Sequence, residues 1–215
     1  MAVLAERALS RHEEHLEDTR KAILAAARHC FAARGYAETS LDDITGAARV
    51  TRGALYHHYD SKPAVFALVV EQVEAEFIDR LAAAGAPGAT IWESIVNGCL
   101  AYLDVALDPE IQQIVLRDGP TVLGWSAWRQ VQERYGFGLL RKWLTLAMDR
   151  GFLPTQPVEP LAYLLTGALN EAALSIAQAP DGAQARAEMG AALSGILGRL
   201  GQLVIPANGG SRSAS

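Results

Sequence analysis

The sequence predicts an all-α protein, and two observations support this prediction. Strand signals are nearly absent, because β-branched runs are few and apolar residues rarely alternate with polar ones. Ala, Leu, Glu, Arg and Gln, most of which favour helices, dominate instead, and Gly and Pro interrupt them at intervals. We expect a flexible arm at 1–16, a small three-helix domain at 17–63, a larger helical domain at 64–206 and a disordered tail at 207–215.

Composition narrows the class of protein. The chain has 215 residues and a formal charge of -5, and its nine basic residues up to position 70 are matched by nine acidic ones. The two cysteines are too few for a disulfide framework, which indicates a reducing compartment. The N-terminus has no long apolar run, and the longest apolar stretch, 161–169, falls short of the ~20 residues that span a bilayer. We therefore expect a cytoplasmic protein with no membrane partner.

The N-terminal helices follow from capping signals. An apolar stripe predicts a first helix from Glu17 to Arg34, ended by Gly35. Ser40 and Asp43 have the spacing of a capping box, which predicts a short helix to about residue 47. Thr51 caps a further short helix that ends near residue 58, and Pro63 stands in the first turn of a fourth helix that continues to about residue 84.

Breaks divide the rest of the chain. Residues 85–88 (Gly-Ala-Pro-Gly) form a candidate domain boundary, and Asp118-Gly119-Pro120 is among the later separators. Between these breaks we expect helices at 90–107, 109–116, 125–150, 158–179 and 182–204.

Two short helices joined by a tight turn, after a longer helix, have the layout of a helix-turn-helix. In that motif the second short helix lies in the major groove of DNA. Arg52 can form a bidentate pair with guanine, and Gly53 and Ala54 leave room for the backbone to approach DNA. An amphipathic helix with a solvated polar face is the alternative.

Residues 19–66 resemble the DNA-binding domain of the TetR family, with "TSLDDI" and "VTRGALYHHYDSK" matching at the expected spacing. The resemblance implies a homodimer that reads a palindromic operator in double-stranded DNA. It places Thr51, Arg52, Gly53 and Ala54 against bases, and Thr39, Ser40, Tyr56, His57 and Lys62 against backbone phosphates. Ala54 departs from the Ser or Thr often found there, so one polar base contact is missing.

Residues 85–205 resemble the family only in outline, as a domain that binds a small-molecule effector and dimerises. Bulky aromatic and polar residues here are candidates for a ligand pocket, although each could be plain core. The candidates are Trp92, Tyr102, Arg117, Trp125, Trp128, Tyr135 and Asn170. Apolar stripes on the last two long helices suggest a four-helix dimer interface; an internal hairpin within a monomer is the alternative.

Motifs of enzymes are missing from the sequence. It has no Gly-rich phosphate loop, nucleophile elbow or zinc cluster, so we expect no catalytic residues, no metal and no cofactor. The prediction is a TetR-type regulator, a repressor that a small molecule releases from its operator. The alternative is a helical ligand-binding or adaptor protein without sequence-specific DNA binding.

Overall fold

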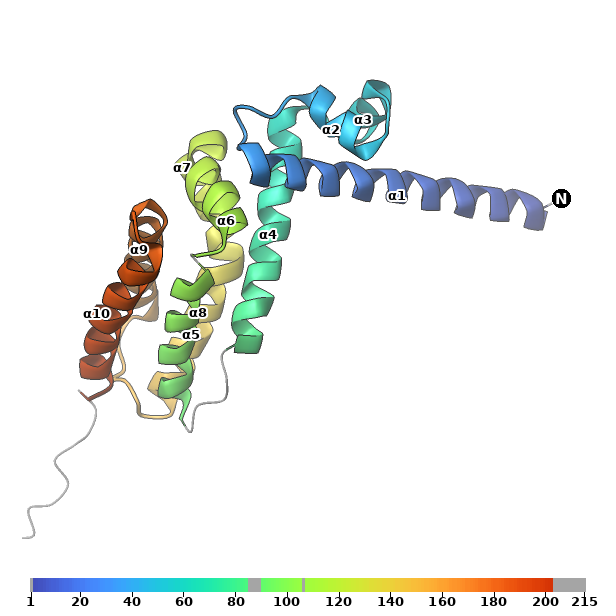
Figure 1. Cartoon of the computed structure of the whole chain (residues 1–215). Helices are drawn as coiled ribbons and strands as arrows, with labels where there is room; N and C mark the ends of the chain where they lie inside the picture. The colour runs from blue at the N-terminus through green and yellow to red at the C-terminus, as the bar shows by residue number, and fades with distance from the viewer. Residues whose placement is uncertain (1, 85–89, 106, 203–215) are drawn as a thin grey trace, which may run out of the picture. The chain divides into compact units, whose positions relative to one another are not determined.

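The computed structural model describes the backbone of residues 2–84, 90–105 and 107–202. Throughout these ranges the regular elements are helical, which confirms the all-α class (Figure 1). The predicted break at 85–88 and the predicted tail at 207–215 lie outside the described residues. The elements are α1 (Ala2–Arg34), α2 (Leu41–Ala48), α3 (Arg52–His58), α4 (Lys62–Ala84), α5 (Ile91–Val105), α6 (Pro109–Ile111), η1 (Gln112–Asp118), α7 (Gly119–Gln132), η2 (Glu133–Phe137), α8 (Gly138–Asp149), α9 (Val158–Gln178) and α10 (Gly182–Gln202). The two η elements are π-helices, with wider turns than an α-helix.

The first helix is longer than the sequence suggested. Helix α1 begins at Ala2, so residues 2–16, which we expected to form a flexible arm, extend the helix that we expected to begin at Glu17. Figure 1 shows α1 reaching beyond α2 and α3 towards the N-terminus. The physical reason is composition: Gly and Pro are absent from residues 1–34, and Ala, Leu, Glu and Arg have high helix propensity.

The chain forms two compact units, and neither is one continuous segment. The first unit combines Met1–Ala75 with Pro109–Val131, and the second combines Glu76–Asp108 with Gln132–Ser215. One border falls inside α4 and another falls at the end of α7. This division differs from the predicted one, which assigned 64–206 to a single domain, because α6, η1 and most of α7 belong with the N-terminal helices.

The core of the first unit is built around aromatic rings from α1 and α4. Phe31 and Phe66 are fully buried, with ring centroids 5.1 Å apart in an edge-to-face arrangement. Ile44 of α2 and Leu55 of α3 are also fully buried, which anchors both short helices to the unit's core. Each short helix therefore buries one face and leaves the opposite face open.

The segment Pro109–Val131 joins this unit through polar contacts as well as packing. Arg28 of α1 makes a bidentate ion pair with Glu110 of α6, at 2.7 and 2.8 Å. Asp118 of η1 accepts a hydrogen bond of 2.7 Å from the backbone N–H of Tyr36. Gly35 has φ +79°, and a Cβ there would stand 2.9 Å from the side chain of Gln113. The stop signal that ends α1 is thus also the place where η1 approaches.

The predicted break at Asp118-Gly119-Pro120 does not occur. The chain stays helical from η1 into α7, and the non-helical residue lies later, at Gly124, with φ 76° and ψ 155°. Pro120 is in the first turn of α7, where its missing N–H interrupts little of the helical hydrogen bonding. A glycine tolerates the positive φ at the actual break.

The second unit has its own apolar core, in which α5, α8, α9 and α10 take part. Ile95, Leu103, Leu144 and Leu197 are each fully buried in it. Helices α9 and α10 pack against each other, and each also packs against α5. No helix in the described part of the chain combines the length and the apolar character needed to cross a bilayer.

Candidate nucleic-acid interface

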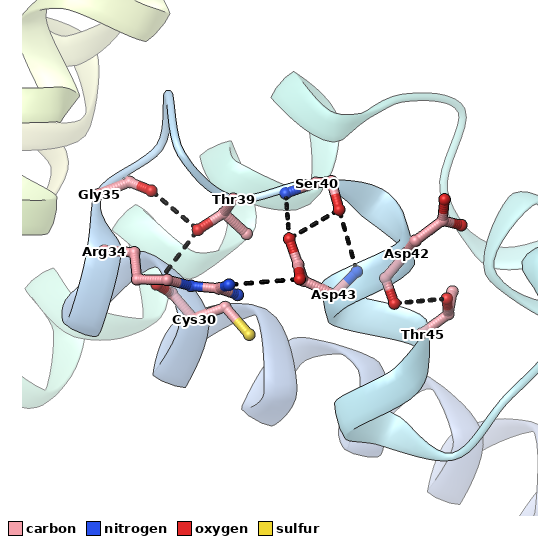
Figure 2. Close-up of polar contacts among 8 residues, drawn as sticks. All are labelled: Cys30, Arg34, Gly35, Thr39, Ser40, Asp42, Asp43 and Thr45. Atoms are coloured by element: carbon pink, nitrogen blue, oxygen red, sulfur yellow. Dashed lines mark hydrogen bonds and ion pairs between the residues drawn. The ribbon is translucent and has the colours of Figure 1, made fainter.

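Helix α2 begins with a complete capping box. The Ser40 hydroxyl oxygen accepts from the backbone N–H of Asp43 at 3.1 Å, and the Asp43 carboxylate accepts from the backbone N–H of Ser40 at 2.8 Å. Arg34, at the end of α1, reaches the same carboxylate at 3.2 Å (Figure 2). These hydrogen bonds, chiefly those from Ser40, lower the pKa of Asp43 from 3.8 to about 2. The cap fixes where α2 starts and connects it to α1.

The turn between the short helices depends on one residue in a left-handed conformation. Arg49 has φ 56° and ψ 40°, and its backbone N–H bonds to the carbonyl of Gly46. The N–H of Val50 bonds to Thr45 O at 3.0 Å, which closes the end of α2. Thr51 then caps α3, because its hydroxyl accepts from the backbone N–H of Ala54 at 3.1 Å.

Helix α3 separates inward and outward residues as the helix-turn-helix interpretation predicts. Leu55 is fully buried, while Tyr59 just after the helix is 5% exposed and donates from its hydroxyl to the Arg20 carbonyl at 3.1 Å. The opposite side carries exposed predicted contacts, and Ala54 is half-buried. The exposed residues are Thr51, Arg52, Gly53, Tyr56 and His57.

Arg52 forms an ion pair with an acidic residue of the other short helix. Its Nε lies 3.1 Å from Oδ1 of Asp42 on α2, and both side chains are well exposed. The pair therefore links the outward sides of the two short helices. The sequence held a signal for this partner, since an acidic residue in the first turn of α2 is favoured by the helix dipole, but not for the contact itself.

The predicted contact of Thr39 with a phosphate does not agree with its position in the structure. Its side chain is only 1% exposed, so no phosphate can reach it. Its hydroxyl donates to the carbonyl of Gly35 at 2.8 Å and lies 3.2 Å from that of Cys30 (Figure 2). Thr39 binds together the end of α1 and the loop before α2, whereas its neighbour Ser40 is exposed.

Lys62 is half-buried rather than free on the surface. Its Nζ stands 4.0 Å from the centroid of the Tyr36 ring, a cation–π contact. Burial lowers the pKa of Lys62, and the carboxylates of Asp118, Asp43 and Glu38 oppose that shift. The ammonium group thus contributes to the packing at the start of α4 as well as to the local charge.

The candidate ligand residues fall into different places. Tyr102 and Asn170 line one cavity of about 60 Å³ in the second unit, and the Tyr102 hydroxyl donates to Asn170 Oδ1 at 2.5 Å. Trp92 lines a separate hollow between α5 and α10. The other four candidates, Arg117, Trp125, Trp128 and Tyr135, line neither.

Trp128 was a candidate for the ligand pocket, but its contacts are structural. It is 3% exposed and lies in the first unit, where its indole N–H donates to the carbonyl of Val115 at 3.0 Å. In a π-helix that carbonyl would pair with residue 120, which is a proline without an N–H. Trp128 therefore supplies a hydrogen bond that Pro120 cannot, and its role is structural.

Three further residues of the cavity lining are Trp143, Gln132 and Thr166. Trp143 is another of the bulky aromatics that could line a pocket, whereas Gln132 and Thr166 were missed. Thr166 lies one turn before Asn170 on α9, so helical spacing was a usable signal for it. Nothing in the local sequence distinguishes Trp143 from the aromatic residues that lie elsewhere.

The geometry defines a helix-turn-helix DNA-binding protein, and comparisons with known proteins agree. Residues 23–69 match the family described as "Bacterial regulatory proteins, tetR family", and residues 92–200 match "Tetracyclin repressor-like, C-terminal domain". A TetR-family transcriptional regulator from Pectobacterium atrosepticum, with a known crystal structure, is 41% identical, covers 87% of this chain and 96% of that chain, and has a TM-score of 0.77. The chain belongs to the TetR family of transcriptional regulators.

More distant relatives extend the comparison. The transposon Tn10 TetC protein of Escherichia coli is 24% identical over 155 residues, which are 72% of this chain and 78% of that protein. The structure of RolR with its ligand resorcinol shares the fold, with a TM-score of 0.69 over 90% of this chain and 96% of that chain, at 16% identity. Proteins of this family bind operator DNA as dimers and bind small-molecule ligands; they are regulators, not enzymes.

Proposed function

We propose that this regulator is a repressor that binds a palindromic operator as a homodimer and is released by a small-molecule ligand. The observation that carries the proposal is the outward side of α3. There Arg52, Tyr56 and His57 are exposed beside Gly53, on a short helix that is capped at its start and anchored to the core by Leu55.

Gly53 supports a role in close approach to DNA. A Cβ at this position would meet only Thr51 Oγ1, at 3.8 Å, so the fold of the chain does not require a glycine there. Glycine within a helix costs about 1 kcal/mol relative to alanine. A groove that receives the helix backbone closely would explain the absence of a side chain, and Arg52 next to it is suited to guanine.

The remaining proposed contacts surround α3. Thr51, Arg52, Gly53 and Ala54 would face bases. The proposed phosphate contacts are Ser40, Tyr56 and His57. Lys62, at the start of α4, is half-buried and would contribute positive charge nearby. Thr39 leaves this set because it is buried.

The last two helices support the proposed homodimer. On α9, Leu164 is 73% exposed, and on α10, Ile196 is 56% exposed. Gly167 and Gly195 lie near them in sequence, and a Cβ at either position would meet nothing within 4 Å. Small residues beside exposed apolar ones let two helices approach closely, so a second copy covering this surface accounts for both features.

The apolar stripes predicted on α9 and α10 contain both core residues and residues of the proposed dimer surface. Leu165, Ile176, Leu193 and Leu197 point into the core of their own unit. The proposed dimer surface is therefore narrower than the stripes suggested and consists mainly of Leu164, Gly167, Ala168, Gly195 and Ile196. Ala168 is exposed as well.

Release by a ligand would follow from linkage. If operator and ligand prefer different arrangements of the dimer, each weakens the other by the same factor, typically ~5–150-fold. The cavity in the second unit is the proposed site, and RolR, which has the same fold, was crystallised with resorcinol.

The experiment that tests the proposal is selection of bound sequences from a pool of random duplex DNA, using the full-length protein. We expect enrichment of a palindrome whose half-sites are spaced for two recognition helices, and Arg52→Ala should cost about 1–3 kcal/mol and relax base preference. Enrichment of a single unpaired site would contradict the dimeric reading. Weak binding that salt abolishes, without any preferred sequence, would overturn the proposal.

A further inference from the structure

We propose that the cavity of the second unit takes an uncharged, largely apolar molecule of about one ring, which presents a hydrogen-bond-accepting oxygen to Asn170. This inference rests on the proposed ligand response and specifies its chemistry. It is drawn from the charge, the hydrogen bonds and the size of the cavity.

The lining carries no ionic charge. Among the described residues that line the cavity there is no Asp, Glu, Lys, Arg or His. Cys99 is the one thiol in this lining, and burial raises its pKa to about 12, so it is neutral at physiological pH. Transfer of an ion from water into such surroundings is costly unless a counter-charge meets it. A carboxylate or an ammonium group on the ligand would find none here.

The polar side of the cavity lies along α9. Tyr102 donates to Asn170 Oδ1 at 2.5 Å, so the carbonyl oxygen of this amide already has a hydrogen-bond partner. Within the described part of the chain, the Asn170 amide nitrogen donates no hydrogen bond, and the Thr166 hydroxyl one turn earlier also makes none. An amide nitrogen is only a donor, and a hydroxyl can act as a donor. The cavity therefore favours a ligand with an accepting oxygen.

Apolar surfaces enclose the remainder. Trp143 stands against Gly98, where a Cβ would lie 2.9 Å from its Cζ3 atom, so the glycine allows the indole to pack closely on α5. Ile95 and Leu169 add aliphatic walls. Apolar walls together with donors along α9 suit a ring that carries one polar substituent.

The cavity is smaller than the proposed ligand, so binding requires movement of the lining, and smaller ligands require less of it. The cavity measures about 60 Å³, whereas a cavity of about 150 Å³ holds benzene. A ring therefore enters only if lining side chains move outward, which is how a ligand of this class would alter the packing of α5, α8 and α9. Larger amphiphiles would demand a much greater rearrangement.

The test measures the binding of four one-ring probes to the full-length protein by titration calorimetry. Acetophenone offers an accepting oxygen, ethylbenzene has nearly the same shape without it, and benzoate and benzamidine carry opposite charges. We expect acetophenone to bind at least tenfold more tightly than benzoate or benzamidine, and severalfold more tightly than ethylbenzene. Equal or tighter binding of either ion, or no binding of acetophenone at millimolar concentration, would overturn the inference.

Two substitutions that preserve side-chain shape show whether a change in affinity comes from a lost hydrogen bond or from a disturbed fold. Asn170→Asp keeps the size of the side chain but replaces the donor with a carboxylate. It should weaken acetophenone at least tenfold and improve benzamidine, and unchanged acetophenone affinity would overturn the assignment. Thr166→Val removes the neighbouring hydroxyl at constant shape and should change acetophenone affinity less than Asn170→Asp does. Circular dichroism and melting of each variant show that the fold is retained.

Failure of the ligand inference can be distinguished from failure of the proposed regulator function. Operator binding is measured on the same samples with the selected DNA. Acetophenone binding without any operator binding would support the ligand class and contradict the regulator mechanism. Operator binding together with tight binding of an ion would support the regulator and contradict the ligand class.

Discussion

Arg52 on α3 forms an ion pair with Asp42 on α2, with Nε and Oδ1 3.1 Å apart, on the outward side of the helix-turn-helix. The guanidinium that is best suited to guanine is therefore engaged by a carboxylate of its own chain. In the proposed binding mode Arg52 would exchange this partner for a base, and the carboxylate would also stand near phosphates. Asp42 should thus oppose DNA binding in two ways.

Asp42→Asn should tighten operator binding, because it removes the competing partner of Arg52. Exposed pairs of this kind contribute about 0.2–1 kcal/mol, so we expect a gain of about 1.4-fold to fivefold in affinity at low salt. Fluorescence anisotropy with labelled operator measures it. The control is Asp42→Asn in an Arg52→Ala background: an undiminished gain there would mean that Asp42 acts on the phosphates and not through Arg52.

Thr39→Val should destabilise the protein without changing its contacts to DNA. The substitution keeps the shape of a buried side chain but removes the hydrogen bond to the Gly35 carbonyl. We expect a loss of about 0.5–1.5 kcal/mol in the free energy of unfolding, measured by urea titration. The slope of DNA affinity against salt should remain unchanged, whereas a shallower slope would restore Thr39 as a phosphate contact.

Gly119→Ala should destabilise the first unit. An added Cβ would lie 2.8 Å from Trp128 Cδ1 and 3.3 Å from the carbonyl oxygen of Ile114. Such overpacking costs about 1–3 kcal/mol, which denaturant unfolding detects. Gly124→Ala is the comparison, because a Cβ there meets nothing within 4 Å and the strain arises only from φ +76°. Equal losses would show that the approach of Trp128 to Gly119 is not the cause.

The stability of α2 should depend on acid through Asp43. Its pKa falls from 3.8 to about 2 in the folded state, mainly through hydrogen bonds from Ser40. A lowered folded-state pKa stabilises the fold above the unfolded value, and this contribution is lost as pH falls from about 4 towards 2. Titration of the Asp43 carboxyl by NMR checks the shift. Ser40→Ala should return the pKa towards 3.8 and flatten the dependence of unfolding on pH in this window.

Leu164→Glu should dissociate the proposed homodimer while leaving the fold of the subunit intact, because this side chain is already 73% exposed within one chain. Burial of a new carboxylate between two copies is costly. Sedimentation velocity should show a monomer, with operator affinity reduced. Leu68→Glu on α4 is the control, since Leu68 is 37% exposed and belongs to the first unit, whereas α9 and α10 belong to the second. A dimer that survives Leu164→Glu would place the interface elsewhere.

The helix-turn-helix was predictable because its signals are local. Gly35 ends α1, Ser40 and Asp43 form the box that starts α2, and Thr51 caps α3, each within a few residues of the backbone that it organises. The boundaries of α3 and the burial of Leu55 followed from the same short-range pattern. The extension of α1 to Ala2 was not predicted, because the many charged residues at 2–16 were taken to indicate a flexible arm. The same residues have high helix propensity.

The cavity was less predictable. Aromatic side chains serve equally well as core, as hydrogen-bond donors to the backbone or as ligand walls, and their partners decide which. Trp128 meets the Val115 carbonyl, while Tyr102 meets Asn170 from a helix 68 positions away in sequence. No local pattern contains those partners.

The sequence by itself determined the helical class, the caps and the recognition helix, because propensity and capping act between residues that are neighbours along the chain. The tertiary structure decided that Thr39 is buried, that Arg52 meets Asp42, and that Tyr102 and Asn170 share a cavity while Trp128 does not. It also decided that Pro109–Val131 joins the N-terminal unit. These outcomes depend on packing between distant segments, where burial and hydrogen-bond partners are set by the whole fold.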